Sequence, residues 1–468
     1  MKNKNLWLTF LIFTGAIFLL TWVIPSTSYD DAGALALGTI KPTGIWDVFY
    51  YLSMLLSWFG ENFILVIAIG IFYGIINKTG ALRTLVDKIA KKVKNHEKLF
   101  IMLCSSLFLL VAGLTGIDIA LLSFLPLVAG VILTLGYSKL ICLMATVVPT
   151  AVGVMGSLYA TTLFSPISSY IDSGLSFGWY KVALMIAGLV AINLYLFFTA
   201  KLTKGKEKEE INDEMLFIEK TEGPKKLKLW PIITVFSVIF GLYILGLTPW
   251  SKIYNLTLFS DIHTAVMNFS IGSFTISKSI LGSSLAAFGE WSVSDATALL
   301  LLASIVLILI YRVKWEEAYK GAISGITKIL PIAILVLLSN IVFVLASQSG
   351  ILNTIINTIA NITSGINVFT YSFASFIGAC LSNEGYITSY ITGILSTVVG
   401  DTANLSLLLF IQQVMYGIAM LVAPTSIMLL VGLSYLEVGY TTWMKYIWKF
   451  LLILTTVGLV ALSLAIIL

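Results

Sequence analysis

The sequence predicts an all-α polytopic membrane protein composed of two inverted-topology repeats. Its 468 residues are 58% hydrophobic and 11% charged. Several apolar runs reach the roughly 20 residues that a helix needs to cross a bilayer. One segment also occurs twice without a gap, as TGALRTLVDKIA at 79–90 and as SGILNTIINTIA at 349–360. The first copy and its continuation to Lys98 carry six basic residues, whereas the second copy carries none as far as Asn367.

The unequal charge of the two copies predicts that they lie on opposite sides of the membrane. Short cytoplasmic segments are rich in Lys and Arg, and external segments are poor in both. By the same rule, Lys2 and Lys4 place the N-terminus in the cytoplasm. Inverted repeats of this kind are typical of secondary transporters, in which alternating access uses two pseudo-symmetric halves.

The first repeat is expected over 1–200. Leu6 to Ile24 lacks a small-residue cleavage site, so we expect a retained helix rather than a signal peptide. The apolar segment 99–136 is interrupted at Gly113-Leu114-Thr115-Gly116 and is predicted to form a re-entrant helical hairpin. The expected elements are helix 5–24, an aromatic interfacial segment 45–59, helix 61–78, the basic arm 80–98, hairpin 99–136, helix 140–165 interrupted by Pro149, Gly153 and Gly156, and helix 179–200.

Residues 201–290 are expected to connect the repeats. The stretch 201–229 is dense in Lys and Glu, which is typical of a solvated cytoplasmic linker. A linking helix at 230–247 and a Ser- and Gly-rich external segment at 248–290 follow it. The second repeat, 291–468, then repeats the plan in the opposite orientation. Its expected elements are helix 291–312, helix 321–346, the uncharged arm from Gly350, hairpin 366–400 broken at Ser382-Asn383-Glu384-Gly385, helix 404–433 interrupted between Gly417 and Pro424, and helix 445–467.

Charge and cysteine content limit the kinds of partner and cofactor that the protein is expected to bind. The net charge of +5 comes largely from loops, so it orients the chain in the bilayer and does not indicate nucleic-acid binding. The three cysteines lie far apart in apolar runs, so neither a disulfide nor a metal cluster is expected, and no cofactor is predicted. We therefore expect a multi-pass membrane protein, with a small-molecule solute and the lipid bilayer as its partners.

The substrate site is predicted at the two hairpin tips and the two interrupted helices. Backbone that leaves the helix at membrane depth is tolerated where it is buried in protein or lines a wet cavity. Asp118 lies just beyond the first tip and Glu384 lies on the second. A carboxylate at the membrane centre is unfavourable by at least about 2.5–3.5 kcal/mol, so each acid must be protonated, hydrated or paired with a cation. Alternatively, shallower tips would leave these acids solvated or capping nearby helices.

Other polar residues at the breaks are weaker candidates for contact with substrate. Their alternative role is to satisfy backbone groups that Pro and Gly free in membrane helices. The set comprises Thr115, Gly116, Ser382, Asn383, Thr161, Thr162, Gln413, Thr425 and Ser426. The breaks carry acids without an accompanying Lys or Arg in the sequence, which favours a substrate with a positive group, such as an amino acid.

The resulting hypothesis is a secondary active transporter of a small polar organic solute, with an amino acid ahead of a dicarboxylate. A dicarboxylate would need compensation from helix N-termini. An intramembrane enzyme is the competing class, but HExxH, GxSxG and phosphate-loop motifs are absent from the sequence. A channel would not require two hairpins within an inverted repeat. A non-transporting membrane sensor is a further alternative.

Four segments carry a resemblance to a known family: WVIP at 22–25, NKTGALRTLVDKIA at 77–90, FLPLVAGVILTLGYSKL at 124–140 and APTSIMLLVGLSYLEVGYTTWMKYIWKF at 423–450. The chain resembles the bacterial anaerobic C4-dicarboxylate carriers, particularly their branch of basic amino-acid antiporters, in the ion-transporter superfamily. The resemblance implies an elevator-type transporter, with a domain carrying both hairpins that slides against a scaffold, and homodimers formed through that scaffold. Such carriers typically have two adjacent acids after the first-tip glycine, where this chain has Gly116-Ile117 and then Asp118. The coupling ion, H⁺ or Na⁺, stays open.

Overall fold

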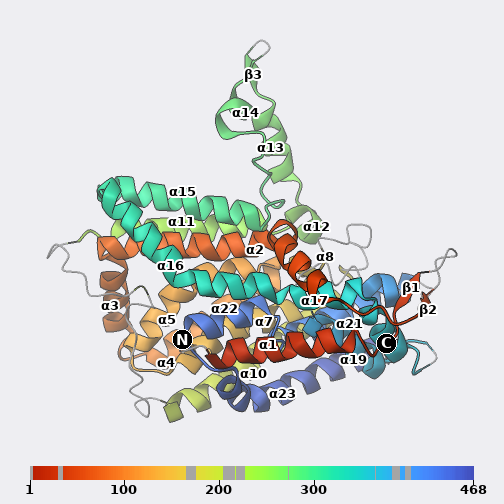
Figure 1. The fold of residues 1–468 in the computed structure, drawn as a ribbon. Helices are drawn as coiled ribbons and strands as arrows, with labels where there is room; N and C mark the ends of the chain where they lie inside the picture. The colour runs from red at the N-terminus through yellow and green to blue at the C-terminus, as the bar shows by residue number, and fades with distance from the viewer. Residues whose placement is uncertain are drawn as a thin grey trace.

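The computed structural model describes residues 4–29, 35–164, 175–203, 217, 227–271, 274–363, 365–381, 391–395 and 402–467. Within these residues, seven helices are long and apolar enough to cross a membrane. The long helices form one elongated body, and α13, β3 and α14 project from it as an arm of short elements (Figure 1). The predicted all-helical membrane architecture is confirmed. The arm lies within 248–290, and the external placement of this segment stays a prediction.

The elements of the first half are α1 (Lys4–Leu20), β1 (Thr27–Tyr29), β2 (Leu35–Leu37), α2 (Ile45–Thr79), α3 (Ala81–Val93), α4 (Glu97–Thr115), the 3₁₀-helix η1 (Ile119–Phe124), α5 (Leu125–Thr134), α6 (Lys139–Ala145), α7 (Val147–Met155), α8 (Thr161–Phe164) and α10 (Gly178–Thr203). The remaining elements are α11 (Trp230–Leu247), α12 (Trp250–Tyr254), α13 (Leu258–Met267), β3 (Ser270–Ile271), β4 (Phe274–Thr275), α14 (Ile276–Leu281), α15 (Val293–Tyr311), α16 (Trp315–Ser339), α17 (Ile341–Gln348), α18 (Ile351–Ala360), α19 (Val368–Leu381), α21 (Thr402–Ala419), α22 (Ile427–Tyr435) and α23 (Tyr440–Ile467). The strands form two antiparallel hairpins, β1–β2 and β3–β4.

The two copies of the repeated segment have the same local structure. Gly80 follows α2, adopts the left-handed conformation with φ of 68° and starts α3. Gly350 follows α17 with φ of 74° and starts α18 in the same way. Each glycine therefore separates an apolar helical run, which spans α16 and α17 in the second half, from a short amphipathic helix. Glycine suits this position because an L side chain rarely adopts a positive φ. The inverted placement of the two copies across a membrane stays a prediction.

The two amphipathic helices, α3 and α18, differ in their surroundings as well as in their charge. The lysines of α3 are largely exposed, while Leu82, Leu85 and Val86 are buried. The uncharged α18 is instead covered by the β1 segment, where Asn353 Nδ2 donates to the carbonyl of Thr27 over 2.9 Å. Thr354 Oγ1 donates to the carbonyl of Pro25 over 2.6 Å. Polar residues of α18 thus bind the segment that follows α1 through hydrogen bonds.

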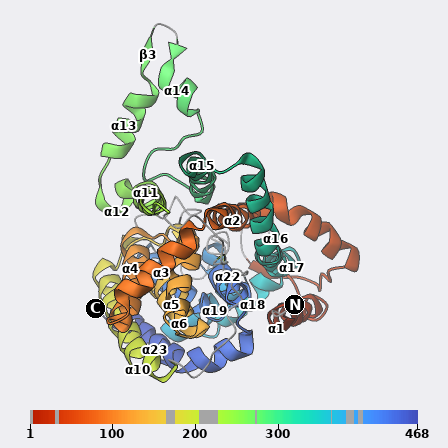
Figure 2. The same ribbon diagram turned by 90° about the vertical axis from the view of Figure 1, so that its left-hand side faces the viewer.

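A close helix crossing joins the two halves through four glycines. Gly70 and Gly74 of α2 face Gly321 and Gly325 of α16, and each pair has the small-xxx-small spacing that lets membrane helices approach closely. A Cβ added at Gly325 would lie 2.0 Å from the Gly70 carbonyl oxygen, and one at Gly74 would lie 2.3 Å from that of Gly321. In the view along the helices, α11, α15, α2 and α16 form a row above the cluster that contains α4, α5, α10, α19, α22 and α23 (Figure 2).

Several expected boundaries differ from those in the structure. The interfacial segment 45–59 and helix 61–78 form the single helix α2, which is kinked at Phe59. The break expected at Pro149 occurs earlier, at Thr146, because proline is tolerated in the first turn of a helix, where its missing N–H has no intrahelical partner. The break between α21 and α22 coincides with the predicted interruption before Pro424. The linker 204–216 and 218–226, and the second tip 382–390, lie outside the described residues.

Candidate functional site

The first predicted tip forms a tight turn at Gly116. This residue ends α4 in the left-handed conformation, with φ of 75°, and its N–H donates to the carbonyl of Ala112 over 2.9 Å. A Cβ at this position would lie 2.2 Å from the carbonyl oxygen of Tyr159 and 2.6 Å from Thr161 Oγ1. The turn is therefore pressed against residues 157–162, which follow α7 and are called the α7–α8 segment below.

Asp118 is buried between this turn and the α7–α8 segment. Its Oδ1 accepts a hydrogen bond from the backbone N–H of Ile119 over 2.6 Å, which caps η1. The same oxygen accepts from Thr162 Oγ1 over 2.9 Å. The structure thus brings Asp118 and Thr162 together and gives the carboxylate the capping role considered as an alternative. Since both hydrogen bonds end on Oδ1, the carboxylate retains acceptor capacity on Oδ2.

Three hydroxyl groups of the α7–α8 segment are buried and have no hydrogen-bond partner within the described residues. They are Ser157 Oγ, Tyr159 Oη and Thr161 Oγ1. Buried polar groups in folded proteins are almost always hydrogen-bonded, to protein or to ordered water. Three such groups within five residues therefore make this segment a candidate place for a bound polar ligand or water. A second cluster of the same kind, Tyr371, Ser372 and Ser375, lies on α19.

The hydroxyl of Thr115, by contrast, is used within its own turn. It donates to the carbonyl of Val111 and accepts from the N–H of Ile117 over 3.3 Å. Thr115 therefore satisfies backbone groups at the break, which is the alternative role considered for it. The same holds for Ser426, which caps α22 and donates to the carbonyl of Met420 over 2.8 Å.

Gln413 connects the second interrupted helix to the first. It is fully buried in α21, and its Nε2 donates to the carbonyl oxygens of Ser157 over 2.7 Å and of Val154 over 3.0 Å. Val154 lies in the last turn of α7, and Ser157 lies just after the helix, where carbonyls are no longer paired within the helix. The Val154 carbonyl also accepts from the N–H of Ser157 over 3.2 Å. Gln413 Oε1 is buried without a partner within the described residues. One polar side chain thus holds the two interrupted helices together.

Thr425 lies at the second break and points to the other predicted hairpin. Its Oγ1 donates to the carbonyl of Cys380, near the end of α19, over 2.9 Å. The expected tip residues that follow α19, namely Ser382, Asn383 and Glu384, lie outside the described residues. Their predicted meeting with Thr115 and Asp118 around one cavity therefore stays a prediction.

A buried lysine lies beside the α7–α8 segment, contrary to the expectation that the helix breaks lack cationic side chains. Lys181 of α10 is 1% exposed, and its Nζ donates to the carbonyl of Leu158 over 3.4 Å. It also lies 5.5 Å from the ring centroid of Phe164. The sequence pattern does not single out Lys181, because the residue lies at the start of the apolar run 179–200 that predicts a transmembrane helix. Its position two residues after Trp179, at the edge of an apolar run, was the available signal.

The short helix α12, which precedes the projecting arm, contacts the first tip. Tyr254 Oη donates to the carbonyl of Leu114 over 2.8 Å. Lys252 Nζ lies 5.6 Å from the ring centroid of Tyr159. The first tip, the α7–α8 segment, α10, α12 and α21 therefore meet in one place, and they bring together residues separated by up to about 300 positions in the sequence.

These features define the class of protein. Seven apolar helices, interrupted helices and charged side chains buried at the interruptions are the properties of a helical polytopic membrane protein. The family model of the C4-dicarboxylate anaerobic carriers matches residues 4–467, so the chain belongs to this transporter family. Membership of a carrier family agrees with the expectation that the chain is not an enzyme.

Two relatives and one solved structure are similar to the chain. YfcC of Escherichia coli (strain K12), named as a candidate basic amino acid antiporter, is 21% identical over 403 aligned positions, and the match covers 81% of this chain and 72% of YfcC. An uncharacterized protein of Haemophilus influenzae is 20% identical over 417 residues, covering 84% and 73% of the two chains. The crystal structure of the YdaH transporter of Alcanivorax borkumensis covers 99% of this chain and 98% of its own, with 11% identity and a TM-score of 0.45.

Proposed function

We propose that this protein is a secondary active transporter of an amino acid, working by exchange or by proton coupling. One observation carries the proposal: Asp118 and Lys181, of opposite charge and both buried, are hydrogen-bonded to the same short α7–α8 segment. An amino acid carries an ammonium and a carboxylate group only a few ångströms apart. The carboxylate of Asp118 and the ammonium of Lys181 have charges complementary to these two groups of the substrate.

The unpartnered hydroxyls support the same assignment. Ser157, Tyr159 and Thr161 lie between or beside the residues that hold Asp118 and Lys181. Hydroxyl groups both donate and accept hydrogen bonds, so they suit the two ends of a zwitterion equally. The amide oxygen of Gln413 adds a further buried acceptor. A polar solute bound here would satisfy groups that otherwise have no partner in the described part of the chain.

A C4-dicarboxylate is the second candidate, favoured by the name of the family. Lys181 supplies the cationic group that such a substrate needs, which the sequence had not indicated. However, the second carboxylate of the substrate would approach Asp118, and two carboxylates in one site repel unless one is protonated. A dicarboxylate carrier with this site would therefore require a protonated Asp118, whereas an amino-acid carrier would use its charged form.

The deciding experiment is counterflow in proteoliposomes loaded with a panel of basic amino acids, zwitterionic amino acids and dicarboxylates. Asp118→Asn mimics the protonated acid, so it is expected to abolish amino-acid exchange and to preserve dicarboxylate exchange. Lys181→Met is expected to impair the exchange of either substrate. Lys328→Met, which removes another lysine from an apolar helix, α16, serves as the matched control and is expected to retain exchange. Amino-acid exchange that survives both Asp118→Asn and Lys181→Met would refute the proposed site.

The wider mechanism belongs to the same proposal. We place the protein in the cytoplasmic membrane of a bacterium with its N-terminus inside, moving its substrate by an elevator motion of a hairpin domain in a homodimer. The matching pairs of long helix, left-handed glycine and amphipathic helix in the two halves support two related repeats. Glu384→Gln tests the second tip in the same counterflow assay, and unchanged exchange would remove Glu384 from the predicted site.

A further inference from the structure

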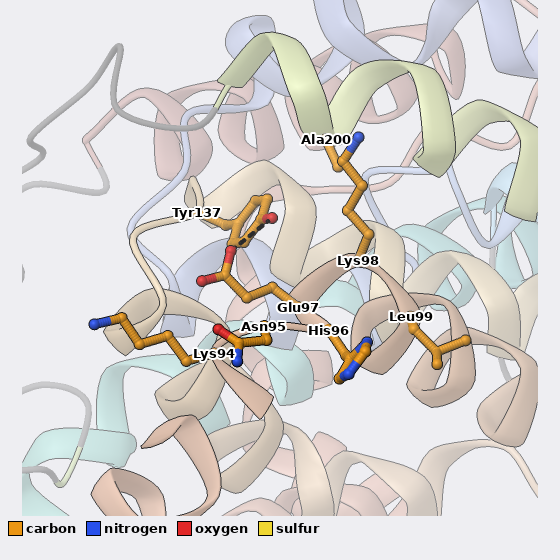
Figure 3. A pocket seen from close by; sticks show the side chains of 8 residues that line it. All are labelled: Lys94, Asn95, His96, Glu97, Lys98, Leu99, Tyr137 and Ala200. Atoms are coloured by element: carbon orange, nitrogen blue, oxygen red, sulfur yellow. Dashed lines mark hydrogen bonds between the residues drawn. The ribbon is translucent and has the colours of Figure 1, made fainter. Parts of the chain in front are cut away.

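A basic pocket lies at the opposite end of α4 from the candidate substrate site. Glu97 at the start of α4 and Thr115 at its end are about 27 Å apart along the helix axis. The pocket has a volume of about 510 Å³. It is lined by Lys94, Asn95, His96, Glu97, Lys98, Leu99, Tyr137 and Ala200 (Figure 3). It therefore combines the loop between α3 and α4, the loop after α5, and the end of α10.

The pocket favours an anion. Lys94 is exposed, and Lys98 extends toward Ala200, with its Nζ 5.1 Å from the ring centroid of Phe197 (Figure 3). The acidic lining residue, Glu97, is engaged, because its Oε2 accepts a hydrogen bond from Tyr137 Oη over 3.2 Å. Burial and the neighbouring carboxylate raise the pKa of Tyr137 to about 12, so the phenol remains a donor at neutral pH.

Apolar side chains lead from the pocket along two packed helices. On α4 the exposed residues recur at helical spacing and form one stripe, which consists of Leu99, Leu103, Leu107, Leu110 and Leu114. The neighbouring α10 also exposes an apolar stripe, which consists of Ile186, Val190, Leu194, Phe197 and Phe198. The stripe on α4 is about 22 Å long, more than the roughly 15 Å depth of one leaflet of the hydrocarbon core.

We propose that this pocket binds the phosphate-bearing headgroup of an anionic phospholipid, whose acyl chains lie along the exposed faces of α4 and α10. A cationic pocket directly above lipid-facing apolar surface is complementary to both parts of such a lipid. Basic residues at the membrane surface attract anionic headgroups. The ammonium group of Lys98 lies at the edge of the apolar surface, where it can contact such a headgroup. The site is separate from the candidate substrate site, so its test does not depend on the transported solute.

The proposal is tested by measuring the affinity of the purified full-length protein for phosphatidylglycerol in detergent micelles, by native mass spectrometry and by lipid-induced thermal stabilisation. Phosphatidylcholine is the zwitterionic comparison, and glycerol 3-phosphate is the soluble one. The double variant Lys94→Ala with Lys98→Ala removes two cations from the pocket. The double variant Lys88→Ala with Lys91→Ala is the matched control. It removes the same charge from α3, but these two exposed lysines do not line the pocket.

At about 1 kcal/mol per lysine, the pocket variant is expected to bind phosphatidylglycerol about 30-fold more weakly, while the control changes little. Phosphatidylcholine is expected to bind equally weakly to all three proteins. Equal losses in the two double variants would overturn the proposal, because they would show attraction by the general surface charge. Glycerol 3-phosphate that binds as tightly as the lipid would also overturn it and assign the pocket to a free phosphate.

Discussion

Replacing Gly116 by alanine tests whether the first tip must lie against the α7–α8 segment. The change has two separable effects. An L residue in the left-handed conformation, which Gly116 adopts with φ of 75°, is unfavourable by about 1–2 kcal/mol. The new Cβ would also lie 2.2 Å from the Tyr159 carbonyl oxygen, and overpacking of this kind is unfavourable by a further 1–3 kcal/mol or so. The expected loss of stability is therefore about 2–5 kcal/mol.

Gly136→Ala separates the two effects. Gly136 has φ of 84°, but a Cβ at this position would meet no atom within 4 Å, so the backbone effect of about 1–2 kcal/mol is expected alone. The free energy of unfolding of both variants is measured in mixed detergent micelles, and transport is measured by counterflow. Gly116→Ala should lose more stability and most of its exchange, while Gly136→Ala should keep its exchange. Equal losses of stability, or full exchange by Gly116→Ala, would show that the contact with Tyr159 and Thr161 is unimportant.

Further predictions concern the packing between the halves and the polar contacts. Gly325→Ala should lower the free energy of unfolding by about 1–3 kcal/mol, because its Cβ would lie 2.0 Å from a carbonyl oxygen of α2. Gly241→Ala in α11, with no atom within 4 Å, should leave stability unchanged or raised. Gln413→Leu removes the side-chain donor of the Ser157 carbonyl, which should lower the free energy of unfolding by about 1–3 kcal/mol. Unchanged unfolding and exchange would contradict the connecting role of Gln413. The pKa of Tyr137 is raised to about 12 from an ordinary value near 10. Its contribution to stability is therefore present below about pH 10 and lost as the pH rises through 12, and a Tyr137→Phe variant with the same alkaline loss would contradict this.

The position of Lys181 changes which charges are present at the proposed substrate site. From the sequence, acidic breaks without basic residues favoured a positively charged solute. A buried lysine attached to the same segment as Asp118 indicates instead a site with both charges. The competition between an amino acid and a dicarboxylate then depends on the protonation of Asp118, which Asp118→Asn addresses directly.

The sequence by itself determined the class of the protein and two of the places where its helices break. Hydrophobicity over about 20 residues is a local property, and it predicted α11 and α15 almost to the residue. The turn at Gly116 and the break before Pro424 were equally local, because glycine alone readily adopts positive φ and proline lacks a backbone donor. The repeated segment likewise predicted one element that occurs in both halves, and in the structure each copy is a left-handed glycine followed by a short helix.

Tertiary structure decided which of these local elements meet. Gln413 contacts carbonyls more than 250 positions away in the sequence, and the glycines of α2 and α16 are separated by a similar distance. Lys181 reads in the sequence as a residue at the end of a membrane helix, yet packing buries it against Leu158. A polar residue in an apolar run has the same local pattern whether it faces lipid, solvent or a break in another helix. Only the packing of distant helices distinguishes these environments, because burial is a property of all the chain segments around a side chain.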